Sequence, residues 1–378
     1  MVSDYQICKN CVMDSSDPGI IFDQNGVCDH CNGYYKNILP FWKLGKGKEK
    51  ELERIVAKIK KEGEGKDFDC LMGMSGGADS SYMLHVAVKE LGLRPLVFHV
   101  DGGWNSKVST NNINVMIEKL GLDLYTEVIN WEEMKDFQLA YFKSGLPNID
   151  VPQDHAFVAT LYYFAEKHKI KYILNGGNFS TECVRNPKRY FYYGTDMRQI
   201  GDVIKKFGTR PLRTYPFSSV LRHKFYLRYI KGVEVVKLLN YFPYIKADAM
   251  EMLNKEYGWH IYKQKHFESR FTRFYEGYWL PQRFGFDSRR VQYSSLILTE
   301  QMKRDDALRA LEEPALSDGE VREEFTFVAK KLNISEEKLR TYLEMALKFH
   351  DDYNNSEKLF DFGATILHHL GIERAKKR

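Results

Sequence analysis

The residues best suited to chemistry in this chain are Ser75-Gly76-Gly77-Ala78-Asp79-Ser80-Ser81. They follow a short apolar run from Cys70 to Met74 and open an apolar-periodic segment that continues to Leu91, which predicts a strand, a glycine turn and a helix N-terminus. Such a turn directs backbone N–H groups and the positive end of a helix dipole at one small volume. The flanking hydroxyls add hydrogen-bond donors, so the segment predicts a polyphosphate site.

Paired glycines and one acid distinguish this segment from commoner nucleotide loops. Gly76 and Gly77 carry no Cβ, so the backbone can approach an anion closely, and Asp79 supplies the oxygen ligand that Mg²⁺ prefers. The segment lacks the lysine of a GTPase P-loop and the G-x-G-x-x-G pattern of a dinucleotide fold. An ordinary glycine turn is the alternative interpretation, but such a turn would not require hydroxyls, glycines and an acid in this order.

Four cysteines near the N-terminus have the spacing of a metal site. Cys8 and Cys11 form one C-x-x-C pair, and Cys28 and Cys31 form a second pair sixteen residues later. Two such pairs can close a tetrahedron of thiolates around Zn²⁺ with no position left for water, which predicts a structural zinc ribbon rather than a catalytic metal. Four reduced cysteines without metal are the alternative, and His30 is expected beside the site rather than in it.

Alternating strand and helix patterns surround the phosphate loop. We expect strands at 69–74, 95–101, 123–129 and 171–175, and helices at 80–91, 109–120 and 153–168. This alternation is typical of an α/β fold with a doubly wound, mostly parallel sheet, in which ligands bind at the carboxyl ends of the strands. A charged segment within 45–66 has apolar residues on one helical face and is expected to dock as a helix.

Polar residues follow two more of these strands. The second strand precedes Asp101-Gly102-Gly103-Trp104-Asn105-Ser106-Lys107, and the fourth precedes Asn175-Gly176-Gly177-Asn178. We predict that Asp101 and Gly176 contact the nucleotide or its metal. The predicted acceptor contacts are Trp104, Asn105 and Asn178, and the predicted catalytic residues are Ser75, Asp79, Lys107 and Glu182, of which Lys107 would neutralise phosphate charge.

These strand-end residues also have a structural interpretation, because any strand end in such a fold needs turn residues. Asp154 and His155 are expected at the start of their helix, Asp154 as an N-cap.

Beyond about Pro216 the alternation is expected to stop and the composition becomes aromatic and basic. Residues 266–290 interleave arginines with aromatic rings, and Arg270, Arg273 and Tyr275 are predicted to bind a nucleotide-linked or carboxylated sugar. An amphipathic helix with its aromatic residues packed inward is the equally weighted alternative. The C-terminal hundred residues are expected to be helical, with Ser317 and Ser335 at helix starts and a frayed basic tail from Ile372 to Arg378.

The whole chain resembles the N-acetyl sugar amidotransferases of bacterial surface-polysaccharide synthesis, within the PP-loop ATP pyrophosphatase superfamily. The matching segments are the two C-x-x-C pairs, S-G-G-A-D-S-S-Y, D-G-G-W-N-S, L-N-G-G-N and E-S-R-F-T-R-F-Y-E-G-Y-W-L-P at 268–281. The resemblance implies a zinc ribbon at 1–40, a PP-loop domain at 41–215 and a mainly helical substrate- or partner-binding region at 216–378. It assigns Ser75, Gly76, Gly77, Asp79, Ser80, Ser81, Asp101 and Gly176 to ATP and Mg²⁺.

The implied reaction converts an acetamido group of a sugar to an acetamidino group. The amide oxygen attacks the α-phosphorus of ATP and releases pyrophosphate, and ammonia then displaces AMP. No cysteine is placed as a glutaminase nucleophile, because Val2 follows Met1, Cys70 lies within a predicted strand and Cys183 lacks a glycine elbow. We therefore expect a separate glutaminase subunit, resembling the one used in histidine biosynthesis, or free ammonium.

Two other functions are consistent with parts of the sequence. A PP-loop tRNA thiolase would also combine cysteine pairs with this loop, but only Cys70 and Cys183 lie outside the pairs, too few for a three-cysteine iron–sulfur site. A zinc-ribbon nucleic-acid module is disfavoured, because 56 basic against 51 acidic residues give a net charge of only +5 over 378 residues. With no apolar run of about 18 residues, we expect a cytoplasmic protein without membrane or nucleic-acid partners.

Overall fold

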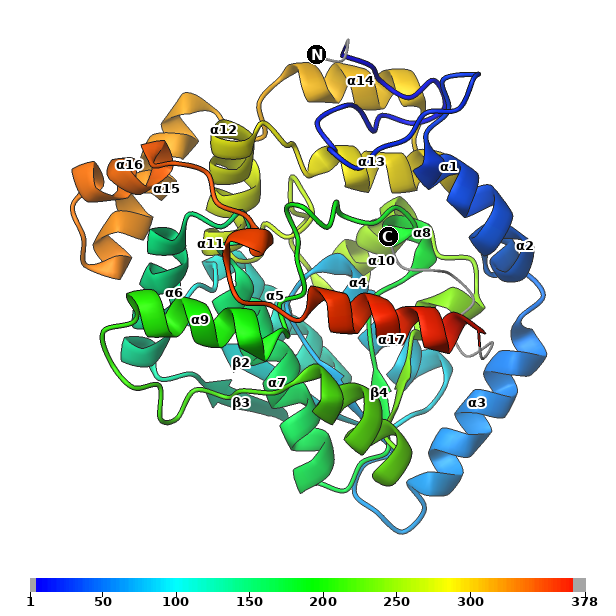
Figure 1. Ribbon diagram of the computed structural model, residues 1–378. Helices are drawn as coiled ribbons and strands as arrows, with labels where there is room; N and C mark the ends of the chain where they lie inside the picture. Colours follow the sequence, from blue (N-terminus) through cyan, green and yellow to red (C-terminus); the bar gives the residue numbers. More distant parts are fainter. Residues whose placement is uncertain (1–4, 370–378) are drawn as a thin grey trace.

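Five parallel strands form the central sheet of this chain (Figure 1), whose computed structural model describes residues 5–369. The strand order is β3-β2-β1-β4-β5, with all neighbours parallel. The strands are β1 (Cys70–Gly73), β2 (Pro95–Asp101), β3 (Leu124–Val128), β4 (Tyr172–Leu174) and β5 (Glu234–Val236). Because the chain moves outward from β1 in one direction and returns to its other side at β4, the switch point lies between β1 and β4. The predicted doubly wound α/β fold is confirmed.

Side chains alternate between the two faces of this sheet, as a period of two requires. Met72 and Val97 pack on one face, in a core with α3 (Glu49–Glu62), α4 (Ala78–His85), α5 (Lys107–Leu120) and α10 (Lys246–Tyr257). Leu71 and Leu96 pack on the other face with α6 (Trp131–Ser144), α7 (Val151–Lys167) and α9 (Met197–Phe207). The inner strands β1, β2 and β4 are therefore mostly buried, and their sequences are mainly apolar, whereas the edge strands β3 and β5 are mostly exposed.

The structure differs from the sequence expectations at three places. The alternation does not stop near Pro216, because β5 pairs with β4 eighteen residues later; a three-residue edge strand is too short for a recognisable pattern. Helix α6 was not expected. Helix α7 begins at Val151 with Asp150 at its N-cap, so Asp154 lies inside the first turn and is not the cap. The three-part division of the chain stays a prediction.

A third core joins the N-terminal segment to the C-terminal helices. Ser317 forms a capping box at the start of α15, and the Ser335 side chain caps α16, as predicted. The α-helices outside the sheet layers are α1 (Asp29–Gly33), α2 (Leu39–Trp42), α8 (Phe179–Glu182), α11 (Arg270–Phe274), α12 (Leu280–Phe284), α13 (Arg289–Leu298), α14 (Arg304–Glu312), α15 (Asp318–Leu332), α16 (Glu336–Glu344) and α17 (Glu357–His369). π-Helical turns occupy Tyr34–Ile38, Val86–Glu90, Arg222–Ile230 and Tyr275–Trp279, and 3₁₀ turns occupy Lys43–Gly45, Leu238–Tyr241 and His350–Asp352.

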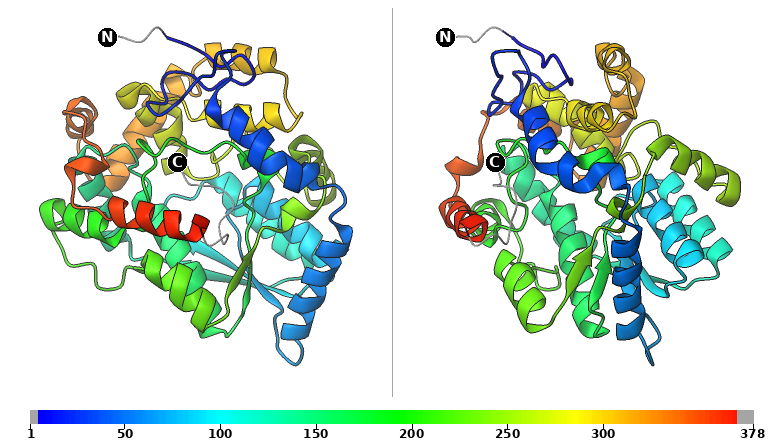
Figure 2. Two further views of the ribbon diagram at one scale, coloured as in Figure 1. Left: turned by 45° about the vertical axis from the view of Figure 1, so that its right-hand side comes forward. Right: turned by 90° about the vertical axis from the view of Figure 1, so that its right-hand side faces the viewer.

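The N-terminal segment lies beside α13 and α14 (Figure 2), although nearly three hundred residues separate them in sequence. Val12 N–H donates to Ser294 Oγ at 3.2 Å, and the Arg304 guanidinium donates to the carbonyls of Cys8 and Cys11 at 2.8–3.2 Å. Arg290 also pairs with Asp14 at 3.0 Å. These contacts fix the cysteine pairs on the C-terminal helices. Among the described residues, none of the helices has the length and apolar character needed to cross a membrane.

The predicted tail from Ile372 to Arg378 lies outside the described residues.

Candidate active site

The predicted phosphate loop connects the end of β1 to the start of α4, with Gly77 at the N-cap. Gly76 has a φ of +81°, and a Cβ there would lie 2.7 Å from the carbonyl oxygen of Ser109. Both the left-handed backbone and the close approach of α5 therefore require glycine at this position. The Ser75 and Ser80 hydroxyls lie 3.2 Å apart across the turn. The loop thus has the form that the sequence predicted.

A cavity of about 490 Å³ opens in front of this loop. The predicted site residues that line it are Ser75, Gly77, Asp79, Ser80, Gly176 and Glu182. Its other walls come from the start of α10, from α13 and from part of residues 259–269, which we call the strap. The strap residues that line the cavity are Trp259, Tyr262, Lys263, Gln264, Lys265, His266 and Glu268. Ser81 is fully buried behind the loop, where its hydroxyl accepts a hydrogen bond from Trp259 Nε1 at 3.1 Å. Ser81 therefore fixes the strap rather than facing the cavity.

Hydrogen bonds from α5, from Ser106 before it and from the phosphate loop hold the strap in place. Asn112 of α5 bonds the backbone of His260, donating to its carbonyl at 2.9 Å and accepting from its N–H at 2.8 Å. The Ser106 N–H donates to the Glu268 carbonyl at 3.1 Å, and the Ser75 hydroxyl donates to the Glu268 carboxylate at 3.4 Å. These contacts hold the strap residues 265–268 directly above the phosphate loop.

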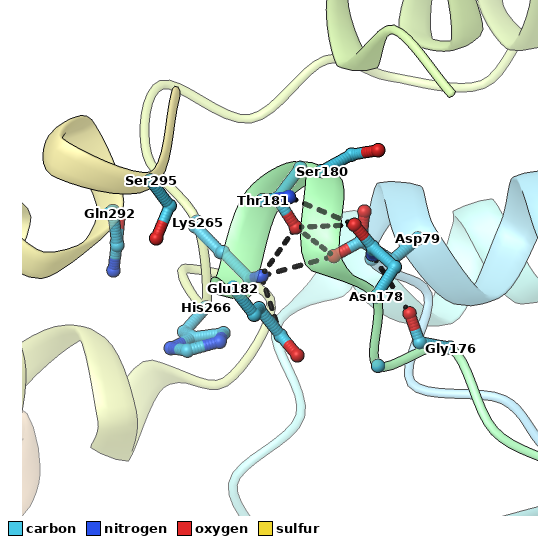
Figure 3. A network of polar contacts seen from close by, with 12 residues as sticks. Asp79, Gly176, Asn178, Ser180, Thr181, Glu182, Lys265, His266, Gln292 and Ser295 are labelled. Atoms are coloured by element: carbon cyan, nitrogen blue, oxygen red, sulfur yellow. Dashed lines mark hydrogen bonds and ion pairs between the residues drawn. The ribbon is translucent and has the colours of Figure 1, made fainter. Parts of the chain in front are cut away.

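Asp79 is the centre of a polar network (Figure 3). Lys265 Nζ lies 3.1 Å from Asp79 Oδ2 and 2.7 Å from Glu182 Oε1. Lys265 also donates to Thr181 Oγ1 at 3.2 Å, and the Tyr244 hydroxyl donates to Asp79 Oδ1 at 2.6 Å. The strap lysine therefore joins two acids from different strands' ends into one cluster on the cavity wall.

The charges in this network are mutually dependent. Burial alone would raise the pKa of Asp79, but Lys265, Lys246 and the Tyr244 hydroxyl hold it below its usual range. Burial likewise opposes the charged form of Lys265, yet Asp79 and Glu182 raise its pKa overall. Burial lowers the pKa of Lys246, and among the described residues the structure gives its Nζ no ion-pair or hydrogen-bond partner. Lys246 thus lines the cavity, and no carboxylate of the described residues lies within ion-pair distance of its Nζ.

A smaller, mainly apolar cavity of about 240 Å³ adjoins the first and shares Ser75, Asn175 and Glu268 with it. Phe98, Phe157 and Leu161 form apolar walls. His99 Nδ1 lies 2.8 Å from the Met74 carbonyl and so donates to it, which leaves Nε2 to accept from Asn105 Nδ2 at 2.8 Å. The chain therefore places an apolar slot next to a charged one.

Several predicted site residues do not reach the main cavity. Lys107 is exposed at the first position of α5 and lines neither cavity. Asp101 accepts from the Gly103 N–H at 2.8 Å and shapes the turn. Asn105 lines only the smaller, apolar cavity. Asn178 is buried and caps α8, accepting from Thr181 N–H at 2.9 Å and donating to the Gly176 carbonyl at 3.0 Å. The contacts of Asp101 and Asn178 instead stabilise the turns in which they lie.

The aromatic residues predicted to bind the acceptor are packed in the core instead. Trp104 is fully buried and packs against Trp131 and Phe271, with ring centroids 5.3 and 4.8 Å away. Tyr275 is 1% exposed. The structure therefore favours the alternative interpretation of this block, in which the aromatic stripe packs inward.

The two predicted substrate arginines are engaged with acids of α15. Arg270 lies 3.0 Å from both Glu323 and Glu324, and Arg273 lies 2.7 Å from Glu320 and 3.2 Å from Glu324. Neither arginine lines the described cavities. Their charges hold α11 against α15, and sequence could not show this because the acids lie about fifty residues away.

Replacing Glu324 by Gln is expected to lower the free energy of unfolding by about 3 kcal/mol. Glu324 is 1% exposed and bonds both arginines, and breaking a buried pair leaves uncompensated charge. Urea unfolding followed by tryptophan fluorescence measures the change. Glu323→Gln is the matched control, because Glu323 is 69% exposed and its loss is expected to cost less than about 1 kcal/mol. Equal effects of the two variants would contradict this assignment.

The four N-terminal cysteines converge as predicted. All are fully buried, and their sulfur atoms lie within 4.8 Å of one another, at 3.8 Å for Cys8–Cys31 and 3.6 Å for Cys11–Cys28 and Cys28–Cys31. A tetrahedron of thiolates with metal–sulfur bonds of about 2.3 Å has sulfur atoms about 3.8 Å apart. Backbone N–H groups of Asn10 and Cys28 donate to Cys8 Sγ at 3.4 and 3.2 Å. The group can hold a metal ion.

The remaining two cysteines are separate and buried. Cys70 lies within β1, and Cys183 follows α8 and is 7% exposed. Burial raises the pKa of both thiols, that of Cys183 to about 12. Neither thiol has the exposure or the lowered pKa of a nucleophile.

Sequence reasoning missed Lys246, Tyr244, Lys265 and His266 as site residues. The one available signal was the run Lys263-Gln264-Lys265-His266, which places three basic residues just before the E-S-R-F segment. Lys246 and Tyr244 had no such signal.

Residues 268–367 match the family described as LPS biosynthesis protein WbpG-like, C-terminal domain. The match begins at the E-S-R-F-T-R-F segment that carried the predicted resemblance. Among curated proteins, the chain is 31% identical over 118 residues to the uncharacterized protein MJ1599 of Methanocaldococcus jannaschii, covering 31% of this chain and 40% of that protein. It is 26% identical over 144 residues to an NH₃-dependent NAD⁺ synthetase of Methanococcoides burtonii, covering 36% and 52%. The chain thus spans about half or less of these relatives.

Solved structures give weaker likenesses. NMN synthetase from Francisella tularensis matches with 13% identity and a TM-score of 0.29, over 80% of this chain and 98% of that one. NH₃-dependent NAD synthetase from Campylobacter jejuni matches with 12% identity and 0.31, over 80% and 98%. The U34-tRNA thiolase NcsA of Methanococcus maripaludis, with its [4Fe-4S] cluster, matches with 15% identity and 0.33, over 91% and 90%. These scores are too low to carry an argument about activity.

Proposed function

We propose that this chain, whose residues 268–367 match the WbpG-like C-terminal domain of LPS biosynthesis proteins, is an ATP-dependent amidotransferase that converts a sugar acetamido group to an acetamidino group. The observation that carries the proposal is the phosphate loop facing a cavity lined by Asp79, Lys265 and Lys246, the last with no ion-pair partner between residues 5 and 369. An anion cradle next to an apolar slot suits a nucleotide with its phosphates in one and its base in the other. The C-terminal family supplies the link to surface polysaccharides.

In the proposed reaction, the cavity residues would hold ATP so that it activates an amide. The phosphate loop and Lys246 would hold the β- and γ-phosphates, so that the amide oxygen of the acceptor attacks the α-phosphorus and pyrophosphate leaves. Asp79 and Glu182 carry the oxygen ligands that suit Mg²⁺, which would stabilise charge on the leaving pyrophosphate. Lys265 lies between these acids and limits their repulsion. Adenylation turns a poor leaving oxygen into AMP, which ammonia can displace.

The first test measures AMP release by the purified chain with Mg-ATP and ammonium. A diacetamido UDP-sugar, a diacetamido nonulosonic acid and bulk tRNA are offered separately. We expect stimulation by one of the sugars and an amidine product in its mass spectrum. Stimulation by tRNA alone would overturn the proposal in favour of a thiolase.

We further propose that ammonia comes from a separate glutaminase subunit of the histidine-biosynthesis type, and that the reaction takes place in the cytoplasm. The burial and raised pKa of Cys70 and Cys183 support this, since a glutaminase needs a reactive thiolate. Release of glutamate from glutamine by the chain alone would contradict it.

We propose that the four-cysteine cluster holds one structural Zn²⁺. Cys11→Ser is expected to lose the metal and to lower the thermal unfolding midpoint, because it removes one of the four thiolates that would bind the ion and link the two C-x-x-C pairs. Inductively coupled plasma mass spectrometry gives the metal content. Cys183→Ser is the control and should keep one zinc per chain. Iron and acid-labile sulfide in place of zinc would refute the assignment.

A further inference from the structure

His266 lies in the strap between two residues that contact the phosphate loop. Lys265 on one side pairs with Asp79, and Glu268 on the other accepts a hydrogen bond from Ser75. The imidazole lines the main cavity and its side chain is 39% exposed. Figure 3 shows it beside Lys265 and Gln292. His266 therefore faces the space in which phosphate chemistry is proposed.

A buried carboxylate orients this imidazole. Glu276 Oε1 lies 3.0 Å from His266 Nδ1, so the ring donates there, and the Glu276 side chain is 9% exposed. The other Glu276 oxygen accepts from Ser288 Oγ and Gln292 Nε2, each at 3.4 Å. With Nδ1 engaged, Nε2 has no partner among the described residues. A histidine held at Nδ1 by a carboxylate, with Nε2 facing a cavity, has the geometry of an acid–base group.

The backbone at His266 supports a role for its side chain. Its φ is +66°, in the left-handed region where a residue other than glycine costs about 1–2 kcal/mol. Such strain recurs where a side chain must be held in an active site. A glycine would relieve the strain but would remove the imidazole from the cavity.

We propose that His266 is the proton acceptor of the amidine-forming half-reaction and that Glu276 is its positioning residue. This inference rests on the proposed function. Attack by the amide oxygen leaves the hydrogen on the amide nitrogen, so the adenylylated intermediate is an O-adenylyl imidium cation with one N–H. Ammonia forms the new C–N bond to its carbon, the C–O bond breaks, and the electron pair of that bond leaves with AMP. The imidium N–H and the three hydrogens of ammonia make four, the amidinium product keeps three, and the fourth passes as a proton to His266 Nε2.

The charged groups around His266 favour its protonated state. Burial opposes the imidazolium, but Glu276 and Glu268 outweigh burial and the neighbouring Lys265, and raise the pKa of His266 to about 9. Asp150 and Asp154 of the α7 start also face it. The neutral base therefore appears as the pH rises toward 9, and the step it assists should accelerate over that range.

His266→Asn separates the two half-reactions, and asparagine tolerates the left-handed backbone. We expect ATP–pyrophosphate exchange with the acceptor sugar to change less than about 3-fold, while amidine formation from ammonia falls about 100-fold. Hydroxylamine, a stronger nucleophile that is neutral at pH 7, should restore much of the rate. His260→Asn is the matched control in the same strap, because the His260 side chain lines neither cavity, and it should leave both half-reactions unchanged.

Glu276→Gln tests the positioning role by its pH profile at a fixed concentration of free NH₃. Because the carboxylate raises the pKa of His266, its loss should move the midpoint of the amidine-forming rate down by more than one pH unit. Equal loss of exchange and amidine formation in His266→Asn, or an unmoved midpoint in Glu276→Gln, would overturn the inference. Absence of exchange in the wild-type chain with every acetamido sugar would instead show that the proposed function itself is wrong, and this inference with it.

Discussion

Asp79→Asn is expected to lower the rate of ATP cleavage by about 10³-fold while the fold and the metal content persist. The Asp79 carboxylate accepts a hydrogen bond from the Tyr244 hydroxyl at 2.6 Å and forms an ion pair with Lys265 Nζ at 3.1 Å. Asparagine has nearly the same shape and can still accept from Tyr244, but it removes the charge that pairs with Lys265 and that would face Mg²⁺. Pyrophosphate release under saturating Mg-ATP and acceptor measures the effect.

Comparing Asp79→Asn with Tyr244→Phe separates the effect of the Asp79 charge from the effect of its hydrogen bond to Tyr244. Tyr244→Phe removes the hydrogen bond to Asp79 but keeps the carboxylate, so we expect a fall of about 10-fold, close to the worth of one hydrogen bond to a charged group. Circular dichroism melting and metal content, measured on both variants, report on folding. Near-normal turnover in Asp79→Asn would show that the loop does not work on ATP in the proposed way.

The negative charge of Asp79 also predicts how the free energy of unfolding changes at acidic pH. The pKa of Asp79 lies below its usual range in the folded chain, so its contribution to stability is present above the unfolded pKa and is lost as the pH falls through the lower, folded value. Asp79→Asn should therefore flatten the loss of stability in acid.

The sheet and the phosphate loop could be predicted because their signals are local. Strands β1, β2 and β4 are short, mainly apolar runs followed by glycines or polar residues. Position 76, which adopts a left-handed φ, is visible in the sequence as a glycine. The cysteine pairs are likewise readable, since each C-x-x-C brings two sulfurs to one side within four residues. Sites built from residues that are close in the sequence could therefore be predicted from residue type and spacing alone.

The rest of the site depends on contacts between distant segments. Lys265, in a strap that has no periodic pattern, lies 186 residues from Asp79, and Tyr244, just before α10, lies 165 residues from it. Arg270 and Arg273 have the residue types of an anion site, yet acids on α15 already engage them. A cation's role is decided by whether a carboxylate lies nearby in space, and that was not available from one sequence.

Lys246→Met is expected to lower kcat/KM for ATP by about 10³-fold, at the lower end of what one cation contributes to phosphoryl chemistry. Lys246 lines the main cavity at the first position of α10, and within the described range of the chain its Nζ has no acid partner. Burial lowers the pKa of Lys246. A phosphate bound beside it would gain more interaction free energy than one beside a lysine that an acid already pairs with. Methionine keeps the unbranched stem and removes only the charge.

Lys255→Met provides the matched control, because it makes the same substitution on the same helix at an exposed position outside both cavities. It should leave kcat/KM unchanged. If Lys246→Met weakens ATP binding and also the binding of free pyrophosphate, measured by calorimetry, the lysine holds the phosphates that leave. If only the acceptor's KM rises, Lys246 contacts the acceptor instead, and the phosphates must then be held by the loop backbone and the strap.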